Sequence, residues 1–303
     1  MKNTEYKIIS DGSCDLSDEL VEAYGITVVP FYVSFDEKTY VKEKEEIGIR
    51  DFYERMVVNK NVYPKSSLPN VQDYVNAFTP MVQEGTAIIC LCITTKFSGS
   101  MQSAVNAKNI ILEEYPDAQI YVMDTTINTV LQGLFVLEAG WMCQQKVPYE
   151  EAVQKLEEIK STGRIFFTVG SIDYLSHGGR IGKLSSIAVS ALGIKPIITL
   201  KDGEIFSSGV ARGRKRSLDK VIKLLMEYLE ENKVKEPQKE FSICIGYGYD
   251  YEEAVMFEEY AREQIARVYG PQEKIPLFQI GATIAVHTGP YPLGFGIVKR
   301  PVL

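Results

Sequence analysis

The sequence predicts an α/β protein built from two α/β domains. Strand-like and helix-like segments alternate through most of the 303 residues, which is typical of a sheet covered by helices. The run AIICLCI at 87–93 has the uninterrupted hydrophobicity of a strand buried on both faces. After Gly163 the pattern changes to a glycine-rich loop and a hairpin-like segment. We therefore expect a domain at 1–162 with a mostly parallel sheet and a domain at 163–303 with a mixed sheet.

In the first domain, the expected strands are short runs rich in Ile, Val, Phe and Tyr. They are YKIIS at 6–10, ITVVPFYVSF at 26–35, AIICLCI at 87–93 and AQIYVMD at 118–124. The expected helices lie between and after these strands, at 47–58, 71–85, about 98–115, about 129–145 and 149–161. In the helix near 98–115, apolar residues recur on one face, as in a helix that packs on a sheet.

In the second domain, the strand RIFFTVG at 164–170 precedes a polar, glycine-rich loop at 171–186. Asp202-Gly203 is a typical two-residue turn and predicts a hairpin over 195–211. The remaining expected helices are 186–193, about 215–231 and 251–270, and the remaining strands are 241–248, 275–290 and 294–300. The charged segment 230–240 is expected to be a surface connection.

Composition limits the classes of partner. The net charge of −7 disfavours nucleic acids and anionic membranes. The basic cluster RGRKR at 212–216 is a local exception, which we interpret as a solvated helix start, with a phosphate or partner-docking patch as the alternative.

The five cysteines form no CxxC pair, so we expect free thiols in a reducing compartment. The polar N-terminus has no signal-peptide core, and no apolar run reaches the ~18 residues of a membrane span. We therefore expect a cytoplasmic protein.

Several nucleotide-binding and catalytic motifs are matched only in part, because residues that they require are absent. A phosphate-binding loop would need Gly at His177 and Ser or Thr at Leu184, and a dinucleotide motif fails at Tyr251. A nucleophile elbow around Ser98 fails at Lys96. No ATP, NAD or other cofactor is therefore expected. No metal is expected either, because His287 has no potential ligand near it in the sequence.

Three polar stretches remain as candidate binding elements. In ITTKFSGSMQSA, Ser98 and Gly99 open a helix, whose first N–H groups can bind a carboxylate or phosphate; plain N-capping by Ser98 is the alternative. In YPKSSLPN, two prolines restrain Ser66, although an ordinary loop at a helix entry would also fit. His287 follows an apolar run, where α/β proteins often place ligand-binding groups.

Together these stretches resemble the DegV family over essentially the whole chain. The chain departs from the family pattern at Gly12, where the family has a serine, at Ser66, where it has a threonine, and at Leu68, where it has a glutamine. The matching stretches are DGSCDLS at 11–17, SSLP at 66–69, FSGSMQSA at 97–104, Asp124-Thr125, GGRI at 178–181 and IGATIAVHTGP at 280–290.

The resemblance implies the DegV-like (EDD) fold, with a long-chain fatty acid in an apolar tunnel between the domains. The carboxylate would be bound by Ser66, Ser98, Gly99 and His287, and this chain would have no catalytic residue. The resemblance further implies the FakB type, the acyl-binding subunit of bacterial fatty acid kinase, which presents the carboxylate to a separate ATP-binding subunit. Arg180 and Arg212 would contact that partner or the phosphate.

Two other functions stay open at this point. One is a stand-alone enzyme, kinase-like or a hydrolase, that uses His287 as acid, base or nucleophile. The other is a regulatory lipid sensor that uses the same pocket. No nucleic-acid partner is expected, and transient contact with a membrane surface is compatible with a lipid ligand.

Overall fold

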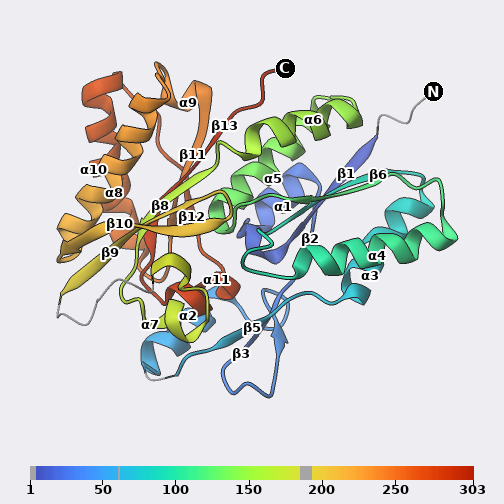
Figure 1. Ribbon diagram of the computed structural model, residues 1–303, viewed down its shortest axis with the longest axis horizontal. Coiled ribbons are helices and arrows are strands. Elements are labelled where there is room, and N and C mark those ends of the chain that lie inside the picture. Colours follow the sequence, from blue (N-terminus) through green and yellow to red (C-terminus); the bar gives the residue numbers. More distant parts are fainter. Residues whose placement is uncertain (1–4, 61, 185–192) are drawn as a thin grey trace.

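The computed structural model describes residues 5–60, 62–184 and 193–303 (Figure 1). Its first sheet has four strands in the order β2-β1-β6-β7, and every pairing is parallel. The strands are β1 (Tyr6–Asp11), β2 (Ile26–Val29), β6 (Ala87–Cys92) and β7 (Ile120–Asp124). Every residue of β6 is buried, which confirms the prediction made from its continuous apolar run.

The second sheet has six strands in the order β10-β9-β8-β13-β11-β12. β11 and β12 pair in parallel, whereas the other neighbours are antiparallel. The strands are β8 (Arg164–Thr168), β9 (Ile194–Lys201), β10 (Glu204–Arg212), β11 (Phe241–Tyr247), β12 (Leu277–Gln279) and β13 (Leu293–Lys299). The predicted hairpin is β9–β10, and Asp202 and Gly203 both have positive φ, 52° and 82°, as its two-residue turn requires.

A third, smaller sheet was not predicted. It has the order β4-β3-β5 and consists of β3 (Tyr32–Ser34), β4 (Val41–Lys42) and β5 (Lys65–Ser67). The single strand predicted at 26–35 is therefore two strands in different sheets, separated around Pro30, which has no N–H to continue a ladder. Ser66 lies in β5 opposite Val33, so the stretch predicted as a loop is paired backbone.

Helices cover the large sheets, and α5 lies between them. The helices are α1 (Asp18–Tyr24), α2 (Ile49–Val58), α3 (Val71–Gln83), α4 (Ser100–Glu114), α5 (Thr129–Gln144), α6 (Tyr149–Lys160), α7 (Asp173–His177), α8 (Arg214–Glu231), α9 (Pro237–Glu240), α10 (Tyr251–Tyr269) and α11 (Ala282–Thr288). α5 is buried on almost every side and packs on β1 of the first sheet and on β11 and β13 of the second. An apolar surface all around a helix is typical of such a central position. None of the described helices is long and apolar enough to cross a membrane.

The prediction of a strand across 275–290 was wrong. Only Leu277–Gln279 is a strand there, and Ala282–Thr288 forms the helix α11. Four of the five residues of α11 that precede His287 are Ala, Ile or Val, and all five of them are buried together with Thr288, so the helix has no exposed polar face. A short helix without a solvent-exposed side has no 3.6-residue pattern that distinguishes it from a strand.

Smaller differences also occur. α4 begins at Ser100, not at Ser98, and the expected surface connection contains α9. The glycine-rich loop contains α7. The helix predicted at 186–193 lies, apart from Gly193, outside the described residues.

Candidate functional site

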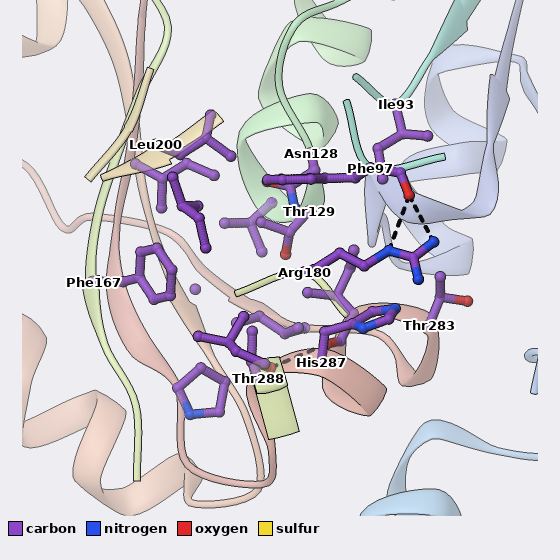
Figure 2. Close-up of a pocket in the computed structure, with 18 of the residues that line it drawn as sticks. Ile93, Phe97, Asn128, Thr129, Phe167, Arg180, Leu200, Thr283, His287 and Thr288 are labelled. Carbon is purple, nitrogen blue, oxygen red and sulfur yellow. Dashed lines mark hydrogen bonds between the residues drawn. The ribbon is translucent and has the colours of Figure 1, made fainter. Parts of the chain in front are cut away.

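A cavity lies between the two large sheets, and most of its wall is apolar. It encloses about 1100 Å³ of space between atoms, including its open mouth. Figure 2 shows Phe167 and Leu200, from the six-stranded sheet, on one side, and Ile93 and Phe97 on the other. Such a wall can bury an apolar ligand but offers it few hydrogen bonds.

Polar side chains from distant segments of the chain also line this cavity. Ser66, Ser98, Arg180 and His287 are all among the lining residues. They come from β5, from the turn before α4, from the loop after α7 and from α11. The structure therefore brings together three of the four residues predicted to bind a carboxylate, and it adds Arg180 to them.

His287 and Ser66 are in direct contact. The distance from His287 Nε2 to Ser66 Oγ is 3.3 Å. Burial, and secondarily the positive charges of Arg180 and Lys65, lowers the pKa of His287 to about 3. The ring is therefore neutral near pH 7. If Nε2 carries the ring proton and donates it to Ser66, the Ser66 hydroxyl proton is free to bind a ligand in the cavity.

The other ring nitrogen of His287 packs against the glycine-rich loop. Nδ1 is buried and has no hydrogen-bond partner in the described part of the chain. A Cβ atom on Gly178 would lie only 2.1 Å from Nδ1. The ring can occupy this position only because residue 178 has no side chain, and the first glycine of the GGRI stretch therefore supports the site directly.

Ser98 accepts a hydrogen bond from Ser100 N at 3.2 Å, so its own hydroxyl proton is free to be donated. Ser98 is therefore not the N-cap that we considered as an alternative, although its Oγ accepts from the first N–H group of α4 while the residue lines the cavity. Gly99 is the N-cap of α4 and is not among the residues that line the cavity. A buried network anchors this turn: Ser100 Oγ donates to Asp11 Oδ2 (2.8 Å), which also accepts from Ile93 N (2.9 Å).

Arg180 is exposed and also lines the cavity, so it lies at the open side, the mouth, of the cavity. Figure 2 shows its side chain directed toward Phe97. Its Nε and Nη2 both donate to the carbonyl oxygen of Phe97, at 3.1 and 2.9 Å. These bonds connect the loop after α7 to the turn that contains Ser98. Lys65 donates to the carbonyl oxygen of His177 at 3.2 Å, so a second cation lies on the same side. The mouth is locally positive in a chain whose net charge is negative.

Arg212 lies apart from this group. It is exposed at the end of β10 and does not line the cavity. The basic cluster around it is only partly the solvated helix start that we expected, because Arg214 forms a two-point ion pair with Glu253 at 2.6 and 2.7 Å. His177 is exposed, as expected, and its ring stacks on Tyr63 with 3.6 Å between centroids.

Glu43 stabilises the start of α11, the helix that carries His287, and the sequence analysis did not identify it. This buried carboxylate accepts hydrogen bonds from Ala282 N, Thr283 N and the Thr283 hydroxyl, at the start of α11. Its contribution depends on a contact between residues far apart in the chain, and no local pattern marks it. All five cysteines are free, as predicted.

The chain is similar to known proteins over nearly its full length. The model of the DegV family, which is described as uncharacterised, matches residues 5–300. A DegV domain-containing protein of Clostridium perfringens is 31% identical over 287 residues, 94% of each chain.

Solved structures are similar as well. A stearic acid-binding protein from Eubacterium ventriosum has a TM-score of 0.91 and 42% identity, over 97% of this chain and 98% of its own. A fatty-acid-binding DegV family protein from Thermus thermophilus has a TM-score of 0.84 and 26% identity, over 98% of this chain and 100% of its own.

Proposed function

The chain belongs to the DegV family, and on that basis we propose that it binds one long-chain fatty acid non-covalently. The acyl chain occupies the apolar cavity, and Ser66, Ser98 and His287 bind the carboxylate. The similar proteins from Eubacterium ventriosum and Thermus thermophilus, which bind fatty acids, support this ligand class.

The observation that carries the proposal is the grouping of Ser66, Ser98 and His287 on a mostly apolar wall. Burying ~14–16 methylene groups at about 0.8 kcal/mol each gives roughly 11–13 kcal/mol before the costs of binding. A carboxylate that leaves water must be hydrogen-bonded in return. The two hydroxyls supply such donors, and the imidazole orients the Ser66 hydroxyl toward the ligand when Nε2 donates to Ser66. Gly99 would contribute through its backbone.

The proposal extends to a partner. We infer that this chain is a cytoplasmic carrier, and that a separate fatty acid kinase subunit phosphorylates the carboxylate. The positive mouth with Arg180 supports this role, as does the lack of an ATP-binding motif in the sequence. Arg180 would meet the phosphate or the partner, and Arg212, exposed on β10, would meet the partner.

We also propose the division into domains at residue 162. All four strands of the parallel sheet precede it, and all six strands of the mixed sheet follow it. The fatty acid would then lie between the two domains.

Titration of delipidated protein with stearic acid and with its methyl ester tests the binding function. We expect the acid to bind much more tightly, because the ester cannot accept charge-assisted hydrogen bonds. Equal affinities would show that Ser66, Ser98 and His287 do not form a carboxylate-binding site.

Incubation of the fatty acid complex with ATP, with and without a fatty acid kinase subunit, tests whether a partner phosphorylates the bound acid. Acyl phosphate made by this chain alone would indicate an enzyme instead of a carrier.

A further inference from the structure

Asn128 is a polar residue of the cavity that the proposed carboxylate site leaves unused. It lines the cavity beside Thr129 (Figure 2). Its Oδ1 atom is buried and has no hydrogen-bond partner within the described structure. Asn128 is also the N-cap of α5, where an asparagine side chain usually accepts from the first N–H groups of the helix. Here the side chain makes no such bond.

Three threonine hydroxyls that line the same cavity already have partners. Thr129 Oγ1 donates to Asp15 Oδ2 at 2.6 Å, and Thr283 Oγ1 donates to Glu43. Thr288 Oγ1 donates to the carbonyl oxygen of Ile284 at 3.2 Å. Each hydroxyl has one proton, so none of these residues supplies a donor to Asn128.

The position of Asn128 is well fixed. The carbonyl oxygen of the preceding residue, Ile127, accepts from Thr94 N at 2.9 Å, next to the end of β6. The Asn128 carbonyl oxygen accepts from Gln132 N at 3.1 Å in the first turn of α5. The backbone that carries the Asn128 side chain is therefore a fixed part of the cavity wall.

A buried acceptor without a donor is unfavourable, and a ligand that brings a donor gains affinity. An unsubstituted acyl chain brings none, whereas a hydroxyl on the acyl chain does. We propose that Asn128 determines specificity and that the preferred ligands are long-chain fatty acids with a hydroxyl on the acyl chain. This inference rests on the proposed fatty acid binding and specifies its substrate class.

The native protein provides the first test. Its affinity for stearic acid is compared with that for stearic acids with one hydroxyl near the carboxylate, in mid-chain or near the methyl end. Because the carboxylate is anchored, only one region of the chain can reach Asn128. We expect about five- to tenfold tighter binding for the isomer with its hydroxyl there, from one added hydrogen bond. The other isomers should bind more weakly than stearic acid, because their hydroxyl is buried without a partner.

Variants identify the group responsible. Asn128→Leu removes the amide and keeps a similar volume, and Asn128→Ala serves as a second variant; the preference for the hydroxylated isomer should disappear in both. Thr168→Val is the matched control, because Thr168 Oγ1 is also buried and unpaired but does not line the cavity. Thr168 follows Phe167 in β8, and consecutive side chains of a strand point to opposite faces of the sheet. It should keep the preference.

These measurements distinguish an error in the role of Asn128 from an error in the proposed fatty acid binding. If stearic acid binds but no hydroxylated isomer binds more tightly, or if the Asn128 variants keep the preference, the assignment of Asn128 is wrong and fatty acid binding stands. If none of these acids binds, the proposed function itself is wrong.

Discussion

Two contacts define the position of the His287 ring in the site. Nε2 lies 3.3 Å from Ser66 Oγ, and Nδ1 faces Gly178. Burial keeps the ring neutral. A carboxylate bound beside it would favour the protonated ring and raise the pKa of His287.

The low pKa of His287 makes a prediction about pH and stability. Between its usual value near 6.5 and the folded value of about 3, the unfolded chain binds a proton that the folded chain does not. Stability therefore falls as the pH falls through this window. Relative to His287→Gln, the ligand-free wild type should lose stability from pH 6.5 downward, as measured by urea unfolding. A difference that stays constant with pH would contradict the buried, neutral ring.

Adjacent glycines in the GGRI stretch should respond differently to substitution. Gly178→Ala places a Cβ against His287 Nδ1, so the ring or the loop must move, and fatty acid affinity should fall at least tenfold. Gly179 has φ of 67° and open space around its Cβ position. Gly179→Ala should cost about 1 kcal/mol of stability through backbone strain and leave affinity unchanged. Titration and thermal unfolding separate the two effects, and equal losses of affinity would argue against a role specific to Gly178.

The two cavity serines should each contribute to affinity through a bond to a charged group. Such bonds are worth about 1.5–3 kcal/mol, so Ser66→Ala and Ser98→Ala should each weaken stearic acid binding about ten- to hundredfold. Ser17→Ala is the control, because Ser17 caps α1 by accepting from Leu20 N and lies outside the cavity lining. Unchanged affinity in both cavity variants would place the carboxylate elsewhere.

At the scale of elements, α11 depends on a residue from another part of the chain. Its first N–H groups would be unpaired in a buried position without the carboxylate of Glu43. Because α11 is buried on nearly every side, its sequence lacks the alternation of apolar and polar residues that marks a helix. The segment was therefore predicted, wrongly, to be a strand. The parallel and hairpin strands were predictable because their patterns are local.

Removing the Glu43 carboxylate should therefore destabilise α11. Glu43→Ala leaves two buried N–H groups unpaired, and we expect a loss of about 2–4 kcal/mol in the free energy of unfolding, with weaker fatty acid binding because His287 shifts. Glu45→Ala is the matched control: Glu45 is exposed and forms a surface ion pair with Lys42 at 3.5 Å. It should change stability by no more than about 0.5 kcal/mol. Similar losses in both variants would contradict the supporting role of Glu43.

At the scale of the molecule, the candidate site depends on segments that only the fold brings together. The individual polar stretches were visible in the sequence, but the contact between Ser66 and His287 spans 221 residues. The bonds from Arg180 to the Phe97 carbonyl and the unpaired amide of Asn128 likewise depend on tertiary placement. α5 packs on both large sheets, and its residues Thr129 and Val130 line the cavity.

The most direct test of fatty acid binding is mass spectrometry of lipid extracted from the purified protein, together with the native mass of the intact complex. We expect one long-chain fatty acid per chain in the wild type, and much less in a Ser66→Ala, Ser98→Ala double variant that folds normally. Wild-type protein that repeatedly contains no fatty acid, and that takes up none after delipidation and incubation with stearic acid, would contradict the account.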